Sequence, residues 1–487
     1  MSSNLPVLLF LVPFVMGVSM PLLTAKRRSW CPNLTLGAFG VMLLLSIANL
    51  RVVLAEGPVE YAFGGWTAPI GIAWLNDSIA AIVVLVMSFV AVITQVYGRV
   101  DTAKDLEKSI PYYTLILIMV SGLVGIIFAA DLFNVFVFLE VVALTGYALV
   151  GAAGGKSLVY AFRYLLLGSF GASLYLLGLG HLYVATGTLN MADLAVRLPE
   201  LITSTAVAGG LIYIFLGLSI KMALIPLHSW LPDAYANAPS SVTPLLASTV
   251  TKVSLVAWIR IEYSLIAQGV EVSHVPVLVL LEELGVVAAL VGGALALIQT
   301  NLKRMFAYGG ISHIGLILIG VSLGNTTGFA GGMFYLINDA VMQASLFMIA
   351  GALIYYHGVH TLEDLRGVGR QSPWLTGALV VAAVAMVGLP PTGGFFGKWN
   401  IILGALEAQH YLAAFAVLAS TLLTLAYFLK IFSCWFHQPQ HATSEPLVVS
   451  NALRISLSAI SFSMIALGLM SDTIFQFLIE SITNGGV

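Results

Sequence analysis

Long runs of apolar residues, each close to the length of one membrane crossing, follow one another through the whole chain. A helix needs about 20 mostly apolar residues to span the hydrocarbon core of a bilayer. The sequence therefore predicts an all-α membrane protein with about 14 transmembrane helices. The predicted spans are residues 4–23, 33–54, 72–97, 110–128, 131–150, 157–186, 205–236, 241–266, 274–298, 304–324, 328–357, 373–407, 409–436 and 451–471.

The seventh run, 205–236, is too long for one crossing and contains Pro226. Proline lacks a backbone N–H and its ring clashes with the carbonyl four residues earlier, so it kinks or ends a helix. We expect this helix to break about one turn after Lys221, near His228. A helix broken at membrane depth is tolerated where it lines a hydrated cavity. The break therefore indicates a polar site inside the membrane.

The twelfth run, 373–407, repeats this arrangement weakly. It contains Pro390–Pro391, and Lys398 follows seven residues later, whereas Lys221 precedes its proline by five residues. Interrupted helices at corresponding places in two halves of a chain are typical of transporters built from repeats, with the ion site at the midplane. The sequence thus predicts two discontinuous helices, 7 and 12, each with a buried lysine.

Four charged residues fall deep inside predicted helices: Glu140, Lys221, Lys252 and Lys398. A charge at mid-bilayer costs roughly 2.5 to 3.5 kcal/mol on insertion scales, so such residues face a protein interior, a partner charge or water. Glu140 lies about 13 Å along its helix from Asp131, and is therefore near the bilayer centre. A carboxylate and a lysine about 4 to 6 Å apart stabilise each other's charged forms. Such a pair can store or release a proton when a neighbouring charge moves.

The composition excludes a soluble protein. Hydrophobic residues make up 59% of the 487 residues and charged residues only 9%, and the mean hydropathy is +1.00, whereas soluble proteins carry about 25% charged residues. The net charge of −2 and the lack of a basic cluster argue against nucleic-acid binding. The chain has two cysteines and no CxxC, flavin, nickel or quinone motif, so we expect neither a metal site nor a cofactor. It could still be a subunit of a redox enzyme.

Lysine and arginine residues are distributed unevenly around the predicted helices. Fourteen of the 20 fall on, or just inside, the connections from odd- to even-numbered helices, three lie on the opposite side and three are intramembrane. Basic residues favour the cytoplasmic side, so both termini are expected outside a bacterial or archaeal cytoplasmic membrane. The first run has no basic segment before it and is followed by Lys26, Arg27 and Arg28, which indicates a retained helix, not a cleaved signal peptide.

Five stretches of the chain carry a family resemblance: DLFNVFVFLEVVALTGYALVG, TGTLNMADL, SIKMALIPLHSWLPDAYANAPSSVTPLLASTVTKV, NLKRMFAYGGISHIGLI and LPPTGGFFGKW. From about residue 110 to residue 410, the chain resembles the antiporter-like, proton-conducting subunits shared by respiratory complex I, membrane-bound hydrogenases and Mrp-type cation/proton antiporters. The start of the first motif and the whole of the second are most similar to the D subunit of the Mrp antiporters.

The resemblance implies a 14-helix fold with two inverted five-helix repeats, helices 4–8 and 9–13. The implied segments are 1–109 for helices 1–3, 110–270 for the first repeat, 271–436 for the second repeat, and 437–487 for helix 14 and a short tail.

The resemblance also implies a polar axis along the middle of the membrane. Four positions match family residues that carry this axis, namely the helix-5 glutamate, the helix-7 lysine, the helix-8 bridging base and the helix-12 lysine. These are Glu140, Lys221, Lys252 and Lys398, in that order. His228 and His313 fall where family members have polar or histidine groups along the axis.

Helix 11 departs from the family pattern. Members often carry a histidine followed four residues later by a lysine, whereas this chain has Asp339 and Gln343 in NDAVMQASLF. The departure removes a base from the second half and adds an acid. After Ser471 the tail is also too short for the lateral helix of the largest complex I member of the family.

Each candidate also has a purely structural interpretation. The buried lysines and Glu140 could form structural ion pairs, and His228 could cap the helix break beside it. Asp339 and Asp233 could each cap a helix end. Arg163 and Arg260 are interpreted as headgroup or loop anchors.

Three classes of function fit these patterns. The first is an ion-translocating subunit of a multisubunit Mrp-type antiporter that exchanges protons for Na⁺ or a similar cation. It would work with other membrane subunits, including a second antiporter-like subunit. The second is a proton-pumping subunit of a complex I-like enzyme or membrane hydrogenase, whose redox chemistry lies in other chains. The third is an autonomous transporter or a membrane anchor.

Overall fold

The computed structural model describes residues 4–102, 109–201, 203–265, 277–437 and 449–483. These residues form a nearly all-helical protein, as the hydropathy pattern predicted. The helices are α1 (Leu5–Thr24), α2 (Cys31–Glu56), α3 (Ser78–Thr102), α4 (Ser109–Phe128), α5 (Leu132–Gly151), α6 (Lys156–Thr186), α7 (Met191–Arg197), α8 (Thr205–Lys221), α9 (Trp230–Asn237), α10 (Thr243–Leu265), α11 (Val277–Ile298), α12 (Leu302–Ser322), α13 (Thr326–His357), α14 (Val368–Gln371), α15 (Pro373–Val387), α16 (Gly393–Glu407), α17 (Tyr411–Trp435), α18 (Asn451–Leu469) and α19 (Ser471–Thr483).

Every predicted span has a counterpart in this set. Within the described ranges, twelve helices are long and apolar enough to cross a membrane, and two more apolar helices, α8 and α15, are shorter. These two are shorter because each stops at one of the expected breaks. The two inverted repeats and their boundaries remain a prediction.

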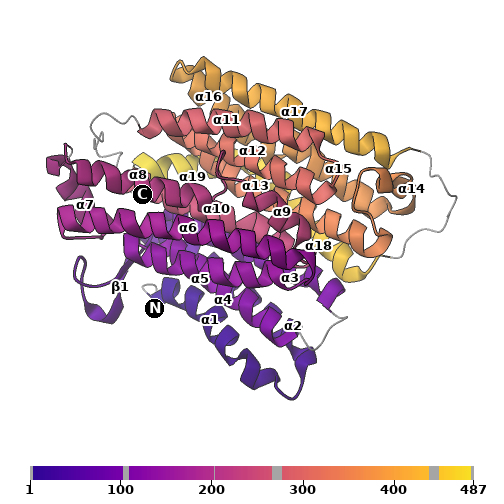
Figure 1. Cartoon of the computed structure of the whole chain (residues 1–487), viewed down its shortest axis with the longest axis horizontal. Helices are drawn as coiled ribbons and strands as arrows, with labels where there is room; N and C mark the ends of the chain where they lie inside the picture. Colours follow the sequence, from indigo (N-terminus) through magenta and orange to yellow (C-terminus); the bar gives the residue numbers. More distant parts are fainter. Residues whose placement is uncertain (1–3, 103–108, 202, 266–276, 438–448, 484–487) are drawn as a thin grey trace.

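The long helices run side by side along one common direction (Figure 1). The start of α1, the short α7 and the turn between α16 and α17 lie at one end of the bundle, and α14 lies at the other. Nearly all of α10, α12 and α13 is buried, whereas α1, α2 and α18 are mostly exposed along their apolar faces. Helix α13 packs against both α10 and α12. A polar residue on any of these three helices therefore faces protein and not lipid.

The third predicted helix begins later than the hydropathy indicated. Its first residues form strand β2 (Ala73–Asn76), which pairs antiparallel with β1 (Val59–Ala62). Helix α3 begins only at Ser78, because the Asp77 carboxylate accepts a hydrogen bond of 2.7 Å from the N–H of Ala80 and so caps the first turn. Over so few residues, the sequence pattern of an apolar strand cannot be distinguished from that of an apolar helix.

The break in the seventh helix also begins earlier than predicted. Helix α8 ends at Lys221 itself, and Ala223 has a left-handed backbone with a φ of 57°. Pro226 accounts for this, because a continuous helix would press the proline ring against the carbonyl of Met222. Lys221 is therefore the last helical residue before the break, and not a residue one turn inside the helix.

Arg260 is not the loop anchor that the sequence suggested. It is buried near the end of α10, where its Nη2 pairs with the Asp77 carboxylate at 2.5 Å. Its Nη1 donates hydrogen bonds to the carbonyls of Leu75 at 3.2 Å and Ala129 at 3.4 Å. A guanidinium supplies enough donors to satisfy several acceptors at once. Arg260 therefore holds α10 to the ends of β2 and α4.

The tail after Ser471 forms a helix that the sequence analysis did not predict. Helix α19 packs against α13 and α3, and the ring of Phe475 lies 4.5 Å from that of Phe334. The tail therefore covers part of the central helix α13.

Candidate functional site

An acid and a base meet where the seventh helix breaks. The Glu140 carboxylate on α5 lies 3.0 Å from Nζ of Lys221. The C-terminus of a helix carries partial negative charge from its free carbonyls and favours a cation there. Lys221, as the last residue of α8, gains this stabilisation in addition to its partner. The structure thus brings together two residues that the sequence analysis singled out, while their role remains a prediction.

Aromatic rings enclose this pair on the side of the break. Trp230, the first residue of α9, donates a hydrogen bond of 2.8 Å from Nε1 to the carbonyl of Ile220. Its ring stacks on that of Tyr164 with 4.0 Å between centroids, and Tyr147 meets Tyr164 edge to face at 4.5 Å. Trp230 therefore ties the resumed helix to the last turn of α8 and fixes the backbone around Lys221.

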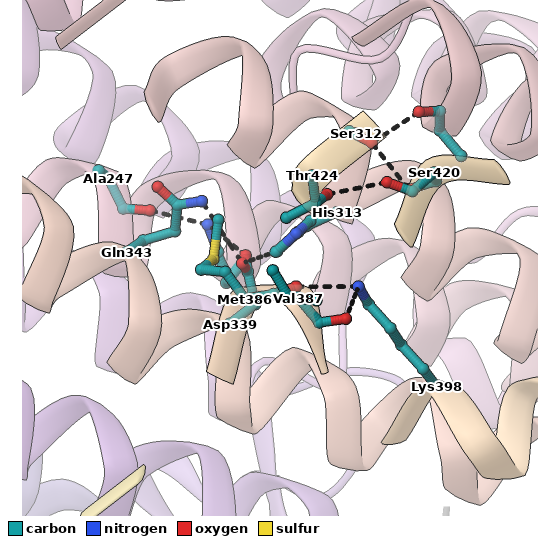
Figure 2. Close-up of polar contacts among 12 residues, drawn as sticks. Ala247, Ser312, His313, Asp339, Gln343, Met386, Val387, Lys398, Ser420 and Thr424 are labelled. Atoms are coloured by element: carbon teal, nitrogen blue, oxygen red, sulfur yellow. Dashed lines mark hydrogen bonds and ion pairs between the residues drawn. The ribbon is translucent and has the colours of Figure 1, made fainter. Parts of the chain in front are cut away.

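A second charged centre lies at the middle of the bundle, where α10, α12 and α13 meet. One oxygen of the Asp339 carboxylate pairs with Nζ of Lys252 at 2.7 Å, and the other contacts Nδ1 of His313 at 2.8 Å. All three side chains are buried. Lys252 also donates a hydrogen bond of 2.8 Å to the carbonyl of Ala247. Figure 2 shows His313 and Gln343 directed at Asp339. Asp339, the residue on α13 that departs from the family pattern, therefore supplies the counter-charge for Lys252.

The Asp339 carboxylate also selects the tautomer of His313. An ionised carboxylate can only accept hydrogen bonds, so Nδ1 of His313 must carry the hydrogen that lies between them. Nε2 is then the nitrogen that gains or loses a proton when the ring titrates. Gln343 adds a weak contact, with Nε2 at 3.5 Å from the same carboxylate oxygen that receives His313.

Lys398 is held by backbone carbonyls. Its Nζ donates hydrogen bonds to the carbonyls of Met386 at 2.9 Å and Val387 at 3.2 Å, the last two residues of α15 (Figure 2). No carboxylate lies within ion-pair distance of Lys398 among the described residues. The negative end of the broken helix therefore replaces a carboxylate partner.

Gly388, directly after α15, leaves room for the side chain of Lys398 to reach these carbonyls. Its φ is +83°, and a Cβ there would lie 3.0 Å from Cδ of Lys398. We expect Gly388→Ala to slow transport, because left-handed backbone costs a residue with a Cβ roughly 1–2 kcal/mol and the added methyl displaces Lys398. Gly377→Ala on the same helix is the control, since a Cβ there meets nothing within 4 Å. Ion flux in membrane vesicles measures both variants, and equal flux in the two would show that the position of Lys398 does not matter.

Two further candidates lie apart from these centres. His228 sits in the break between α8 and α9, with its ring 6.0 Å from that of Tyr308. Asp233 on α9 pairs with Arg304 at 2.5 Å and with Arg163 at 3.8 Å, in a partly exposed cluster. Neither His228 nor Asp233 contacts a buried lysine within the described residues. The cluster joins α6, α9 and α12 at their ends, and in it Asp233 acts as an ion-pair partner and not as the helix cap of its structural interpretation.

Hydroxyl groups beside His313 were missed by the sequence analysis. Ser312 donates a hydrogen bond of 2.6 Å to the carbonyl of Ala289, and its Oγ lies 3.2 Å from that of Ser420 on α17. Thr424 donates to the carbonyl of Ser420 at 2.9 Å (Figure 2). Small polar residues within apolar helices are the only sequence signal for such contacts, and they also occur at ordinary helix–helix interfaces. A search of the described residues finds no group of three His, Cys, Asp or Glu side chains that could hold a metal ion.

A known protein family matches the part of the chain that carries these residues. Residues 129–424, more than half of the chain, match the family described as NADH:quinone oxidoreductase/Mrp antiporter, transmembrane. The chain belongs to this family. The matched region includes both charged centres and Lys398. It therefore covers all the residues that the sequence resemblance assigned to the axis.

Two curated relatives cover nearly the whole chain. The N subunit of the NADH-quinone oxidoreductase of Desulforudis audaxviator is 34% identical over 99% of this chain and 98% of its own length. The D subunit of the Na⁺/H⁺ antiporter of Alkalihalophilus pseudofirmus is 32% identical over 98% of this chain and 96% of its own length. The family therefore includes similar relatives in both a redox enzyme and an antiporter.

Similar solved structures also come from both an antiporter and a redox enzyme. A chain of the Mrp complex from a Dietzia species superposes with a TM-score of 0.89 at 25% identity, covering 99% of this chain and 97% of that one. A chain of an archaeal membrane-bound sulfane sulfur reductase superposes with a TM-score of 0.91 at 28% identity, covering 98% and 97%. These relatives and neighbours are subunits of multisubunit membrane complexes.

Proposed function

We propose that this chain is the proton-translocating membrane subunit of a multisubunit Mrp-type antiporter, which exchanges protons for Na⁺. One observation carries the proposal. Acids and bases lie in direct contact inside the membrane-spanning bundle, at Glu140–Lys221 and at Lys252–Asp339–His313. Buried charges are costly, so groups of this kind inside a membrane domain usually mark an ion pathway. The similarity to the D subunit of a Na⁺/H⁺ antiporter supports the choice of reaction.

The first pair couples proton movement to charge. Opposite charges as close as those of Glu140 and Lys221 offset part of the cost of removing each from water. A proton added to Glu140 leaves Lys221 without its counter-ion, so the lysine then releases its own proton more readily. A positive charge that approaches Lys221 has a similar effect. Each proton that enters at one group therefore favours proton release at the other.

The second centre shares one acid between two bases. Asp339 stabilises the cationic forms of Lys252 and His313 through different oxygens, so a proton gained by one base weakens the hold of the carboxylate on the other. Since Lys252 lies on α10 and His313 on α12, this sharing links different helices of the bundle. No hydrogen bond in the described part of the chain joins Lys221 to Lys252. Transfer between the two centres is therefore assigned to water or to the electrostatic effect of one charge on the other.

The position of Glu140 supports a partner subunit. Its side chain is 28% exposed although it lies deep in the membrane, and Phe133, Val137 and Leu144 on the same face of α5 are also exposed. An ionised carboxylate facing lipid is strongly disfavoured. We therefore propose that another membrane subunit, of the same antiporter-like type, covers this face. Lipid covers the other apolar faces, and no nucleic acid is involved.

A second candidate function is a proton-pumping subunit of a complex I-like enzyme or membrane hydrogenase. The 34% identity to the N subunit of an NADH-quinone oxidoreductase favours it. The same charged centres would serve that role, because the redox chemistry would take place in other subunits. The two functions therefore differ in what drives the protons and not in the path they take.

Everted membrane vesicles can distinguish the antiporter from the redox pump. They are prepared from cells that lack their own exchangers and that express this chain together with the neighbouring genes. The antiporter proposal expects added Na⁺ to dissipate a pre-formed proton gradient with no redox substrate present. Proton movement that requires an electron donor, with no response to Na⁺, would favour the redox pump.

The membrane orientation is a further prediction. The uneven distribution of basic residues places both termini outside the cytoplasmic membrane. In a chain with Cys31 and Cys434 replaced by serine, we expect Thr473→Cys on α19 to react with an impermeant thiol reagent in intact cells. Glu363→Cys, in the connection before α14, should react only after permeabilisation. The reverse pattern of labelling would overturn the orientation.

A further inference from the structure

A gap separates the second charged centre from Lys398. No hydrogen bond within the described residues joins His313 or Asp339 to Lys398, and Figure 2 shows Lys398 turned to the end of α15 instead. A proton cannot cross an apolar gap without a group that accepts and releases it. Any path from His313 to Lys398 therefore depends on what fills the space between them.

The ring of Tyr335 contacts both His313 and Lys398. Its centroid lies 5.2 Å from that of His313 and 5.9 Å from Nζ of Lys398. Tyr335 is one turn before Asp339 on α13, so the two side chains project from the same face of that helix. A Cβ at Gly397 on α16 would lie 2.9 Å from the Tyr335 ring, which shows how closely α16 packs against it. The ring is thus packed against His313, Lys398 and α16.

Two of the unpaired polar atoms among the described residues belong to His313 and Tyr335. Nε2 of His313 and the hydroxyl of Tyr335 are both buried and receive no hydrogen bond from the described residues. Buried polar atoms are nearly always paired, so each exception calls for an explanation such as an ordered water or a catalytic role. Because Asp339 occupies Nδ1, the unpaired Nε2 is also the nitrogen of His313 that exchanges protons. The titrating atom of His313 and the hydroxyl of the tyrosine whose ring contacts both bases therefore both lack a hydrogen-bond partner among the described residues.

We propose that the Tyr335 hydroxyl relays protons between His313 and Lys398, directly or through one water on either side. The protonated imidazole gives its Nε2 proton to a lone pair of the hydroxyl oxygen. The hydroxyl passes its own proton to the free electron pair of neutral Lys398. One N–H and one O–H bond break, one O–H and one N–H bond form, and tyrosine is neutral before and after. The relay rests on the proposed function as a proton-translocating subunit and names one of its steps.

Tyr335→Phe tests the relay because it removes the hydroxyl and keeps the ring with its contacts to His313 and Lys398. Tyr427→Phe is the matched control. Among the described residues the Tyr427 hydroxyl is also buried without a hydrogen-bond partner, but it lies against Gly309, and its ring contacts Phe428 and neither His313 nor Lys398. Both variants lose one hydroxyl from the same part of the bundle.

The complete complex, purified and placed in liposomes, allows two measurements. One is proton entry driven by an imposed membrane potential, in H₂O and in D₂O, and the other is Na⁺-driven proton exchange. For Tyr335→Phe we expect potential-driven proton entry to fall about tenfold or more, as for the loss of a proton-transfer group. The ratio of rates in H₂O and D₂O should rise, since proton transfer then limits the rate. Tyr427→Phe should stay close to wild type in both.

The two measurements separate the relay from the proposed function. Proton entry in Tyr335→Phe equal to that of wild type, or equal losses in both tyrosine variants, would overturn the relay. Absence of both potential-driven and Na⁺-driven proton movement in the wild-type complex would overturn it as well. A wild-type complex that conducts protons through Tyr335 but does not respond to Na⁺ would leave the relay standing and contradict the antiporter.

Discussion

Lys221→Ala is expected to abolish ion exchange while the complex still assembles. The substitution strands the Glu140 carboxylate, which lies 3.0 Å from the lysine in the native chain. Removing one partner of a buried pair typically costs about 3–5 kcal/mol, and Glu140 escapes most of this cost by taking up a proton. The pair then holds no exchangeable charge, although the apolar packing survives. Glu140→Gln should have the same effect from the other side.

Lys221→Arg should not restore exchange. Arginine keeps the positive charge and could still pair with Glu140, but it is effectively never deprotonated in proteins. Lys430→Ala is the matched control, because it also removes a lysine whose ammonium lies at the C-terminal end of a helix. Lys430 donates to the carbonyls of Leu297 and Gln299 at the end of α11 and lies away from the charged centres. Proton and Na⁺ fluxes in vesicles, with complex yield measured alongside, check all of these variants. Full activity in Lys221→Ala would remove the first pair from the mechanism.

Asp339→Asn should reduce ion exchange about as strongly as Lys221→Ala, by acting on the second charged centre. Asparagine has nearly the same shape, so packing is kept, but both Lys252 and His313 lose their only carboxylate partner among the described residues. Lys252 would then be a buried cation held mainly by the carbonyl of Ala247, and desolvation favours its neutral form. We therefore expect proton flux to fall to a small fraction of the wild-type rate.

Gln343→Leu is the comparison for this second prediction. Gln343 touches the same carboxylate only at 3.5 Å and cannot carry a proton as a base, so its loss should reduce flux less. The same vesicle assay distinguishes the two. If Asp339→Asn exchanges ions as fast as wild type, the three-residue centre is structural and the path avoids α13.

Hydropathy sufficed to predict the helical spans, because a bilayer demands about 20 apolar residues for each crossing. The break after Lys221 followed from the chemistry of proline, although its start was placed a turn too late. The hairpin of β1 and β2 was not predictable in the same way. Its second strand is as apolar as the helix that follows, and only the Asp77 cap marks where that helix begins.

The charged residues were recognisable because each is a rare charge in an apolar helix, but their partners depend on packing. The sequence placed an acid, Asp339, in the second half of the chain but did not indicate its partner. The structure pairs it with Lys252 and His313, because α10, α12 and α13 meet at that point. The partners of Lys398 are backbone carbonyls, which no side-chain pattern reveals. The prediction for Arg260 was wrong for a related reason, because its buried partner Asp77 lies far away in the sequence.

The central claim is that protons cross this chain through the buried charged centres in exchange for Na⁺. The most direct test is simultaneous measurement of proton and Na⁺ flux in liposomes that hold the purified complete complex and no redox substrate. The wild-type complex should move the two ions in opposite directions at a fixed ratio, and the complex with Lys221→Ala should move neither. Na⁺-driven proton flux that persists unchanged in Lys221→Ala, or a wild-type complex that moves protons only when an electron donor is added, would contradict the claim.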